Sequence, residues 1–278
     1  MIQNQIDWCE IWKNQMAMHI EQRRGKDCVD NWNDEVEAKN YWKLVQENWE
    51  WTEKIIEDLN ISRESRVLDI GAGPGTLAVP LANKVAHITA VEPSDAMMKV
   101  LRHNLEERGY SNVDCVKKRW EKVNVKKDLL PTYDVVIASY SLGMVDIKES
   151  VQKMTDASSK YVYLYWFAGE TSWHKHRRTL WAMLHEGKSP PTPMPMGDVL
   201  FNALYQVGIY PNVEVFSTQY PDRFSSIEEA VDRFKSEYEV TTPQQESDLR
   251  RYLERVLEND GNDLILRNSA LSMKIWWE

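Results

Sequence analysis

The segment of the sequence with the clearest chemical meaning is a glycine-rich stretch near residue 70. Residues 67–76 read VLDIGAGPGT, an apolar run followed by three glycines at alternate positions. Glycine lets the backbone turn tightly and approach a ligand, because no Cβ stands in the way. We expect a helix directly after this loop, whose free N–H groups and positive dipole end would suit a carboxylate or another anion. The stretch therefore predicts a ligand-binding turn between a buried strand and a helix.

The spacing of the glycines narrows the choice of ligand. A phosphate-binding P-loop ends in Gly-Lys-Ser/Thr, and the lysine is absent here. A dinucleotide fingerprint needs a small residue three places after its second glycine, where this chain has Thr76, and its third glycine comes one residue early, at Gly75. The next apolar run ends in Glu92-Pro93-Ser94, and a carboxylate there can accept two hydrogen bonds from a ribose diol. The spacing therefore disfavours a nucleoside triphosphate and departs from the dinucleotide fingerprint.

Together these features resemble the class I (Rossmann-like) S-adenosylmethionine-dependent methyltransferases. Asp69 with the G-x-G-x-G spacing is similar to the first motif of that family, and residues 133–142, YDVVIASYSL, are similar to its FDVVIASxxL element. The likeness covers residues 32–167 well and the C-terminal strands loosely. It implies an α/β fold with a Rossmann-like, mostly parallel seven-stranded sheet and helices on both faces. It also implies S-adenosyl-L-methionine as cofactor and S-adenosyl-L-homocysteine as product.

The resemblance also implies which residues bind the cofactor. Met97 stands where the family packs an apolar side chain on adenine, and Trp32 with Ala38 and Tyr41 resembles an N-terminal helix that covers the cofactor. The expected cofactor-binding residues are Tyr41, Asp69, Gly71, Ala72, Gly73, Gly75, Thr76, Glu92, Pro93, Met97, Arg119, Trp120, Glu121, Ser139 and Tyr140.

The chain departs from the family at two places. Where the family often has Asp-Ala, with the Asp contacting the adenine amino group, this chain has Lys118-Arg119-Trp120-Glu121, so adenine recognition would fall to the backbone near Trp120 or to Glu121. Where many small-molecule members carry a His pair, it has Leu142-Gly143-Met144. A histidine base at that point is therefore not expected.

Methyl transfer from a sulfonium needs alignment in a dry pocket more than it needs a base. A base is required only if the nucleophile must lose a proton. Tyr140, His174 and His176 are candidates by position. The run His174-Lys175-His176-Arg177-Arg178 is either a solvated face or a site for an anionic substrate. A metal site at His174, His176 and His185 is not expected, because these lack partners at regular spacing.

The pattern of apolar residues divides the chain into an N-terminal helical cap, residues 1–62, and a methyltransferase domain, residues 63–278. The expected strands are 67–70, 87–92, 113–117, 133–139, 161–167, 213–218 and 270–277, and the expected helices of the domain are 95–108, 147–158, 198–207, 226–238 and 243–258. Two insertions, near 168–197 and 222–260, are expected to complete the cap. Within residues 1–62 we expect helices separated by a loop at 24–33, and Ser225/Glu228 and Thr242/Gln245 are expected as capping boxes.

Composition bears on the partner. The 278 residues carry 34 basic and 43 acidic side chains, a net charge of −9, which disfavours binding that depends mainly on nucleic-acid phosphates. No apolar run approaches the ~18 residues of a membrane span. The N-terminal residues do not read as a secretory signal, and Cys9, Cys28 and Cys115 look like free thiols, so we expect a cytoplasmic protein.

Three functions stay open. The first is a methyltransferase for a small molecule. The second is one for RNA or protein, with Lys117–Arg119 and Lys126-Lys127 as the basic footprint. The third is a cofactor-binding protein without turnover. The sequence gives no indication of the oligomeric state.

Overall fold

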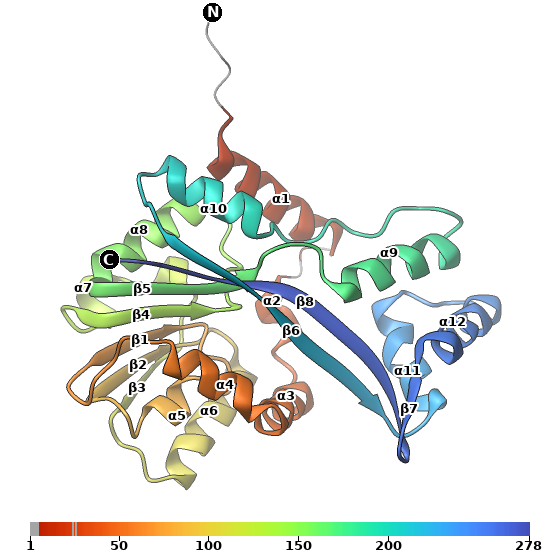
Figure 1. Ribbon diagram of the computed structural model, residues 1–278, viewed down its shortest axis with the longest axis horizontal. Coiled ribbons are helices and arrows are strands. Elements are labelled where there is room, and N and C mark those ends of the chain that lie inside the picture. The colour runs from red at the N-terminus through yellow and green to blue at the C-terminus, as the bar shows by residue number, and fades with distance from the viewer. Residues whose placement is uncertain (1–5, 24, 26) are drawn as a thin grey trace, which may run out of the picture.

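A computed structural model describes residues 6–23, 25 and 27–278, which form one twisted sheet with helices on both faces (Figure 1). The strand order is β3-β2-β1-β4-β5-β8-β6, with β7 paired to β8. Strands β1 to β5 are mutually parallel, and β8 runs antiparallel to β5, β6 and β7. The strands are β1 (Arg66–Ile70), β2 (His87–Val91), β3 (Val113–Val116), β4 (Tyr133–Ser139), β5 (Ser158–Phe167), β6 (Asn212–Phe224), β7 (Glu258–Asp260) and β8 (Asp263–Trp277). The Rossmann-like, mostly parallel sheet is confirmed, and the short β7 is an eighth strand that the sequence did not predict.

The helices divide between the two faces because successive strand residues point to opposite sides. In β1, Leu68 and Ile70 enter a core cluster with α1, α8 and α10, whereas Val67 enters the cluster with α3 to α6. Burial on both faces explains why the parallel strands read as continuous apolar runs. The helices are α1 (Trp8–Gln22), α2 (Cys28–Asn31), α3 (Glu35–Glu47), α4 (Trp49–Glu57), α5 (Ala78–Leu81), α6 (Asp95–Glu107), the 3₁₀ helix η1 (Trp120–Lys122), α7 (Val125–Asp128), α8 (Ile147–Ala157), α9 (Ser172–Leu184), α10 (Gly197–Gln206), α11 (Ile227–Glu237) and α12 (Pro243–Val256).

The N-terminal segment is more finely divided than the sequence predicts. The expected loop at 24–33 contains the short helix α2, where Asp27 accepts hydrogen bonds from the N–H groups at the start of the helix. The helical pattern across residues 41–59 is broken at Asn48, where α3 ends and α4 begins. The amide of Asn48 donates to the Leu44 carbonyl at 2.9 Å, and this bond ends α3 with a local partner.

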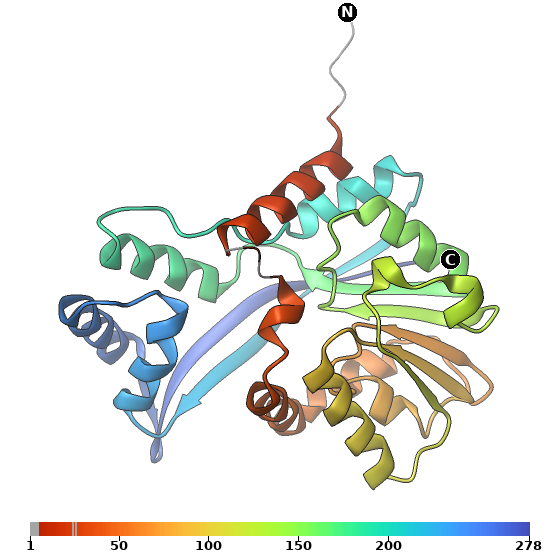
Figure 2. The same ribbon diagram turned by 180° about the vertical axis from the view of Figure 1, so that it is seen from behind.

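The C-terminal strands are longer than predicted and form an arm. Strands β6 and β8 pair without interruption from Asn212/Trp276 to Phe224/Leu264, far beyond the expected 213–218 and 270–277. We call residues 217–271 the C-terminal arm; in Figures 1 and 2 it sweeps away from the sheet and carries α11 and α12 at its end. Pro221 and the polar residues around it interrupt the apolar pattern, so the sequence predicted only the first part of this strand.

The end of the arm has its own apolar core, to which α9 contributes Leu180 and Trp181. Helix α9 was not predicted, because its basic run was interpreted as a solvated face or as a site for an anionic substrate. Thr171 caps its first turn by accepting from the N–H of His174. The capping box at Thr242/Gln245 is present, but α11 is capped by Ser226 and not by Ser225, so that prediction was wrong by one residue.

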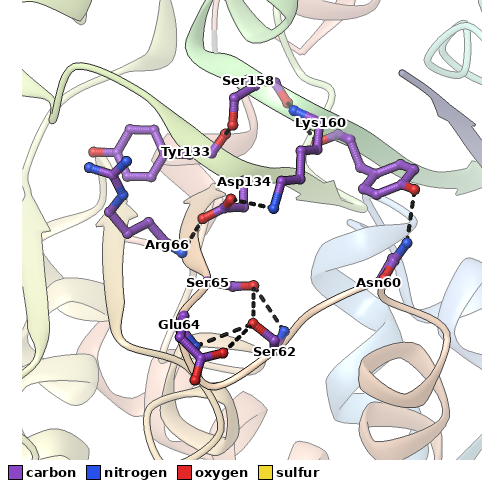
Figure 3. A network of polar contacts seen from close by, with 11 residues as sticks. Asn60, Ser62, Glu64, Ser65, Arg66, Tyr133, Asp134, Ser158 and Lys160 are labelled. Carbon is purple, nitrogen blue, oxygen red and sulfur yellow. Dashed lines mark hydrogen bonds and ion pairs between the residues drawn. The ribbon is translucent and has the colours of Figure 1, made fainter.

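Polar side chains join the amino-terminal ends of β1, β4 and β5 (Figure 3). Asp134 accepts a hydrogen bond from the Arg66 backbone N–H at 2.8 Å and pairs with the Lys160 ammonium at 2.9 Å. These contacts link three neighbouring strands at the edge of the sheet opposite to the glycine loop.

We expect Asp134→Ala to lower the free energy of unfolding by about 1 kcal/mol at neutral pH, since one charged hydrogen bond and one exposed ion pair are lost. The backbone N–H of Arg66 and the Lys160 ammonium lower the pKa of Asp134. Its contribution is therefore complete above the unfolded-state pKa and disappears as the pH falls through the folded-state pKa. Urea unfolding at several pH values checks this, and an equal loss at acid and neutral pH would contradict it.

Candidate active site

A cavity of about 960 Å³ opens at the carboxyl ends of the parallel strands, where sheets of this topology bind ligands. Pockets for one drug-sized ligand measure about 300–1,000 Å³, so this cavity is at the upper end of that range. Of the residues expected to bind the cofactor, those that line it are Tyr41, Asp69, Gly71, Ala72, Gly73, Thr76, Glu92, Pro93, Met97, Arg119, Trp120, Glu121, Ser139 and Tyr140. Trp32 and His176 line it too.

The glycines of the loop have different structural roles. Gly73 adopts a positive φ of 57°, and a Cβ there would meet nothing within 4 Å, so the backbone leaves free space in which a ligand can lie close. Gly75 has a φ of 97°, and a Cβ there would come within 2.5 Å of Val79 and 2.7 Å of Leu101. Gly75 does not line the cavity. The structure places it in the packing between the loop and α6.

The helix after the loop differs from expectation. Helix α5 begins only at Ala78 and has four residues, so the loop does not run into a long helix with a strong dipole. The backbone N–H of Gly73 is instead held by a side chain. Any contribution of this loop to ligand binding therefore comes from turn geometry and from the carboxylates beside it.

Glu92 connects the glycine loop to the end of β2. Its Oε2 accepts from the Gly73 N–H at 2.9 Å, and its Oε1 accepts from the Ser94 N–H at 2.7 Å. The side chain is 7% exposed, and burial raises its pKa while the two N–H bonds act in the opposite direction. Each oxygen keeps a further lone pair, so the carboxylate can still accept from a ligand hydroxyl.

Asp69 is buried with one oxygen unpaired. It is 2% exposed and accepts a hydrogen bond from the Ala78 N–H, but among the described residues nothing donates to its Oδ2. Burial, with the Glu92 charge nearby, raises the pKa of Asp69 to about 7. Buried acceptors are nearly always satisfied in folded proteins, so this unpaired oxygen makes Asp69 a candidate partner for a donor group of a ligand. The free oxygen, the open space at Gly73 and the Glu92 carboxylate all fit a nucleoside-bearing cofactor with an amino group.

The N-terminal segment roofs this end of the cavity. The Ser94 hydroxyl donates to the Trp32 carbonyl at 2.7 Å, and the Asp95 N–H donates to the Asn33 side chain at 3.1 Å. Tyr41 contacts Trp32, with ring centres 5.0 Å apart, and its hydroxyl is hydrogen bonded to Thr76. The roof is thus tied to the start of α6 and to the glycine loop.

The residues after β3 lie at the cavity wall. Arg119, which replaces the expected Asp, forms an ion pair with Asp27 of the roof. The Trp120 indole is buried and donates to the Ser150 carbonyl at 3.2 Å, whereas Glu121 is exposed. Met97 is buried one turn into α6. Arg119 therefore joins the roof to the wall.

Beyond the loop the cavity is walled by aromatic side chains. Tyr140, Phe167, Trp173 and Tyr220 form a chain in which successive ring centres lie 5.0, 5.2 and 5.5 Å apart. Tyr140 has a positive φ of 51°, and its hydroxyl donates to Ser272 at 2.8 Å. Trp173 and Tyr220 were not predicted as site residues, because the placement of α9 and of the arm could not be read from the pattern.

The three candidate catalytic residues are placed differently. Burial raises the pKa of Tyr140, with the Tyr220 hydroxyl adding to the effect, so Tyr140 is protonated at neutral pH. His176 lines the cavity and bonds the Tyr252 hydroxyl at 2.6 Å. His174 lies outside the lining and bonds Thr171 at 2.9 Å, and burial next to Arg177 lowers its pKa to about 4. Within the described part of the chain, no three or more His, Cys, Asp or Glu side chains are grouped to hold a metal ion.

Comparison with known proteins agrees with this geometry. Residues 67–159 match the family described as a methyltransferase domain. A putative methyltransferase from Bacillus halodurans has a similar fold, with a TM-score of 0.52 at 14% identity, over 81% of this chain and 96% of that one. Residues 67–159 therefore carry a methyltransferase domain, and the fold around it is that of the class I, S-adenosylmethionine-dependent methyltransferases.

The relative that aligns over most of this chain has no named acceptor, whereas a relative that names ribosomal RNA aligns over less than half of it. An uncharacterized protein of Haemophilus influenzae is 26% identical over 253 residues, 88% of this chain and 87% of that protein. A probable ribosomal RNA small subunit methyltransferase A of Methanosphaera stadtmanae is 26% identical over 117 residues, which is 41% of this chain and 40% of that protein. Along the described residues, no helix has the length and apolar character needed to cross a membrane.

Proposed function

We propose that this enzyme methylates a small molecule enclosed in the cavity. The observation that carries the proposal is that the cofactor-binding loop and the aromatic wall share one cavity, roofed by the N-terminal helices and closed on another side by the C-terminal arm. Concave, mostly apolar sites with a few polar groups are typical of small-molecule binding. The free thiols Cys9 and Cys115 agree with the cytoplasmic location that we expect.

The residues of the chain would act by binding, orienting and excluding water. S-adenosylmethionine supplies an activated methyl group: the acceptor atom bonds to the methyl carbon as the carbon–sulfur bond breaks, and the electron pair stays on sulfur. We propose that Asp69, Gly73 and Glu92 hold the cofactor and that the aromatic wall orients the acceptor. Tyr140, which stays protonated and donates to Ser272, would help to orient the acceptor and would not act as a base.

The basic residues expected to contact RNA are largely neutralised within the protein. Lys117 pairs with Asp95 at 2.5 Å, and Lys118 pairs with Asp128 at 2.6 Å. Arg119 pairs with Asp27. Paired cations release fewer counterions on binding phosphates, so this surface supports a polynucleotide acceptor less well than the bare sequence suggested.

Transfer of a radiolabelled methyl group tests the proposal. The wild-type enzyme would be incubated with labelled S-adenosylmethionine and, separately, with small-metabolite, RNA and protein fractions of a cell extract. We expect label in the metabolite fraction and none when Glu92→Ala replaces the wild type. Label confined to RNA or protein would refute the small-molecule assignment, and cofactor binding without transfer to any fraction would favour a protein that binds but does not turn over.

Asp69 makes cofactor affinity depend on pH. Its folded-state pKa is raised to about 7, so the buried carboxylate ionises only as the pH rises through neutrality. An ionised acceptor makes a stronger hydrogen bond with a donor on the cofactor, so we expect affinity for S-adenosylmethionine to increase from about pH 6 to about pH 8. Without cofactor the sign is opposite and the range is lower: between the ordinary pKa of 3.8 and the folded-state pKa of about 7 only the unfolded chain ionises Asp69, so stability falls as the pH rises and levels off above pH 7.

Calorimetric titrations and thermal unfolding at several pH values check both trends. In Asp69→Asn, which cannot ionise, both dependences should flatten. A variant with the same pH profile of affinity as the wild type would show that Asp69 does not contact the cofactor.

A further inference from the structure

The cavity continues past Tyr220 to the end of the arm. Its lining there comes from α9, β6 and α11, and we call this part the distal subsite: His176, Asp222, Arg233, Phe234, Glu237 and Tyr238. None of these residues is among those expected to bind the cofactor. The distal subsite is therefore available to the acceptor.

Glu237 is the unsatisfied charge of the distal subsite. Asp222 has partners, since it accepts from the Asn268 amide at 2.7 Å and faces Arg233 at 3.8 Å. In the part of the chain that the structure describes, by contrast, no group forms a hydrogen bond or an ion pair with the carboxylate of Glu237. Its carboxylate is solvent-accessible yet surrounded by protein, as expected for a side chain that faces an internal cavity.

The neighbouring charges leave Glu237 free to accept. Burial raises its pKa and Asp222 adds to this, whereas Arg177, Arg233 and Arg23 act in the opposite direction. Arg233 is directed to Asp222, and Arg177 makes no ion pair with Glu237 and does not line the cavity. A ligand group in direct contact with the carboxylate would outweigh these more distant charges, because Coulomb energy falls with separation. The carboxylate lines the cavity and has no protein partner, so it is open to a cationic group of a ligand.

The surroundings of Glu237 also suit a cation. Tyr238 is buried next to Phe234, with ring centres 5.8 Å apart, and the wall formed by Trp173 and Tyr220 leads from here toward the glycine loop. Aromatic faces attract ammonium groups, and the attraction is larger when the group is desolvated.

We propose that the acceptor carries a positively charged ammonium group, which Glu237 binds in the distal subsite while the rest of the molecule lies along the aromatic wall. This rests on the proposed small-molecule function and adds a substrate class, amines with a second, nucleophilic atom. An ammonium nitrogen has no free lone pair, so the atom that is methylated is a different one, held at the cofactor end of the cavity.

Binding of charge-matched probes to the wild-type enzyme tests the proposal without the natural acceptor. With the protein saturated in S-adenosylhomocysteine, calorimetry would compare phenethylamine with 3-phenylpropionate, which have the same ring and similar length. One charged hydrogen bond predicts that the amine binds about tenfold more tightly or better. An acid that binds as well as the amine, or no detectable amine binding, would overturn the assignment.

A pair of variants assigns the preference to one side chain. Glu237→Gln keeps the shape of the side chain and should abolish the preference for the amine, whereas Glu254→Gln, an exposed glutamate of α12, should preserve it. An unchanged preference in Glu237→Gln would overturn the proposal. The small-molecule function is tested separately. Methyl label in RNA or protein, together with an intact preference for the amine, would refute the small-molecule function but not the cation site.

Discussion

Replacing Glu92 by alanine is expected to weaken binding of S-adenosylmethionine by about 100-fold, the largest affinity change that we predict. The carboxylate fixes the Gly73 and Ser94 N–H groups and would accept two hydrogen bonds from the ribose diol of the cofactor. Each charged hydrogen bond contributes about 1.5–3 kcal/mol. Loss of the two bonds to the ribose, at the lower end of this range, corresponds to roughly two orders of magnitude in Kd. Calorimetric titration measures the effect.

Glu106→Ala is the matched control for this change. Glu106 is an exposed glutamate on α6, away from the cavity lining, and its removal should leave the affinity unaltered. If the Glu92 variant, shown to be folded, bound the cofactor as tightly as the wild type, the placement of the cofactor beside Glu92 would be wrong.

Gly75→Ala is expected to cause the largest loss of stability, about 3–4 kcal/mol. The new Cβ would press on Val79 and Leu101, and overpacking a core costs about 1–3 kcal/mol. A left-handed backbone costs a residue other than glycine a further ~1–2 kcal/mol. Urea unfolding of the variant measures the sum.

Gly73→Ala provides the contrast within the same loop. Its Cβ meets open space, so we expect only the backbone cost of about 1–2 kcal/mol, together with a pronounced loss of cofactor affinity, because the methyl group projects into space that the cofactor needs. Equal stability losses in the two variants would show that the two glycines do not have the separate roles assigned to them.

The parts of the site that could be predicted from sequence are those built from local segments. The glycine loop, Asp69 and Glu92 follow directly from two buried strands, and the parallel sheet brings their carboxyl ends together at one edge. The same reasoning could not show that a side chain at Gly75 would meet Leu101, because that contact depends on how α6 packs against the loop.

The acceptor side of the cavity could not be predicted, because it is assembled by tertiary packing. Trp173 and Tyr220 are in contact only because α9 lies against the arm. The full length of β6 was not predicted, because Pro221 interrupts the apolar pattern of the strand. His174 and His176 were equivalent as sequence, but on a helix they point to different surroundings, and only His176 reaches the cavity. Charge patterning likewise gave no sign that Glu237 would lack a partner.

A crystal structure of the complex with S-adenosylhomocysteine is the most direct test of the central claim. The account predicts the product between the glycine loop and Glu92, with a ribose hydroxyl donating to Glu92, an amino group donating to the free oxygen of Asp69, and the sulfur facing the aromatic wall. Product bound outside the cavity, or in it with Asp69 and Glu92 both uncontacted, would contradict the account.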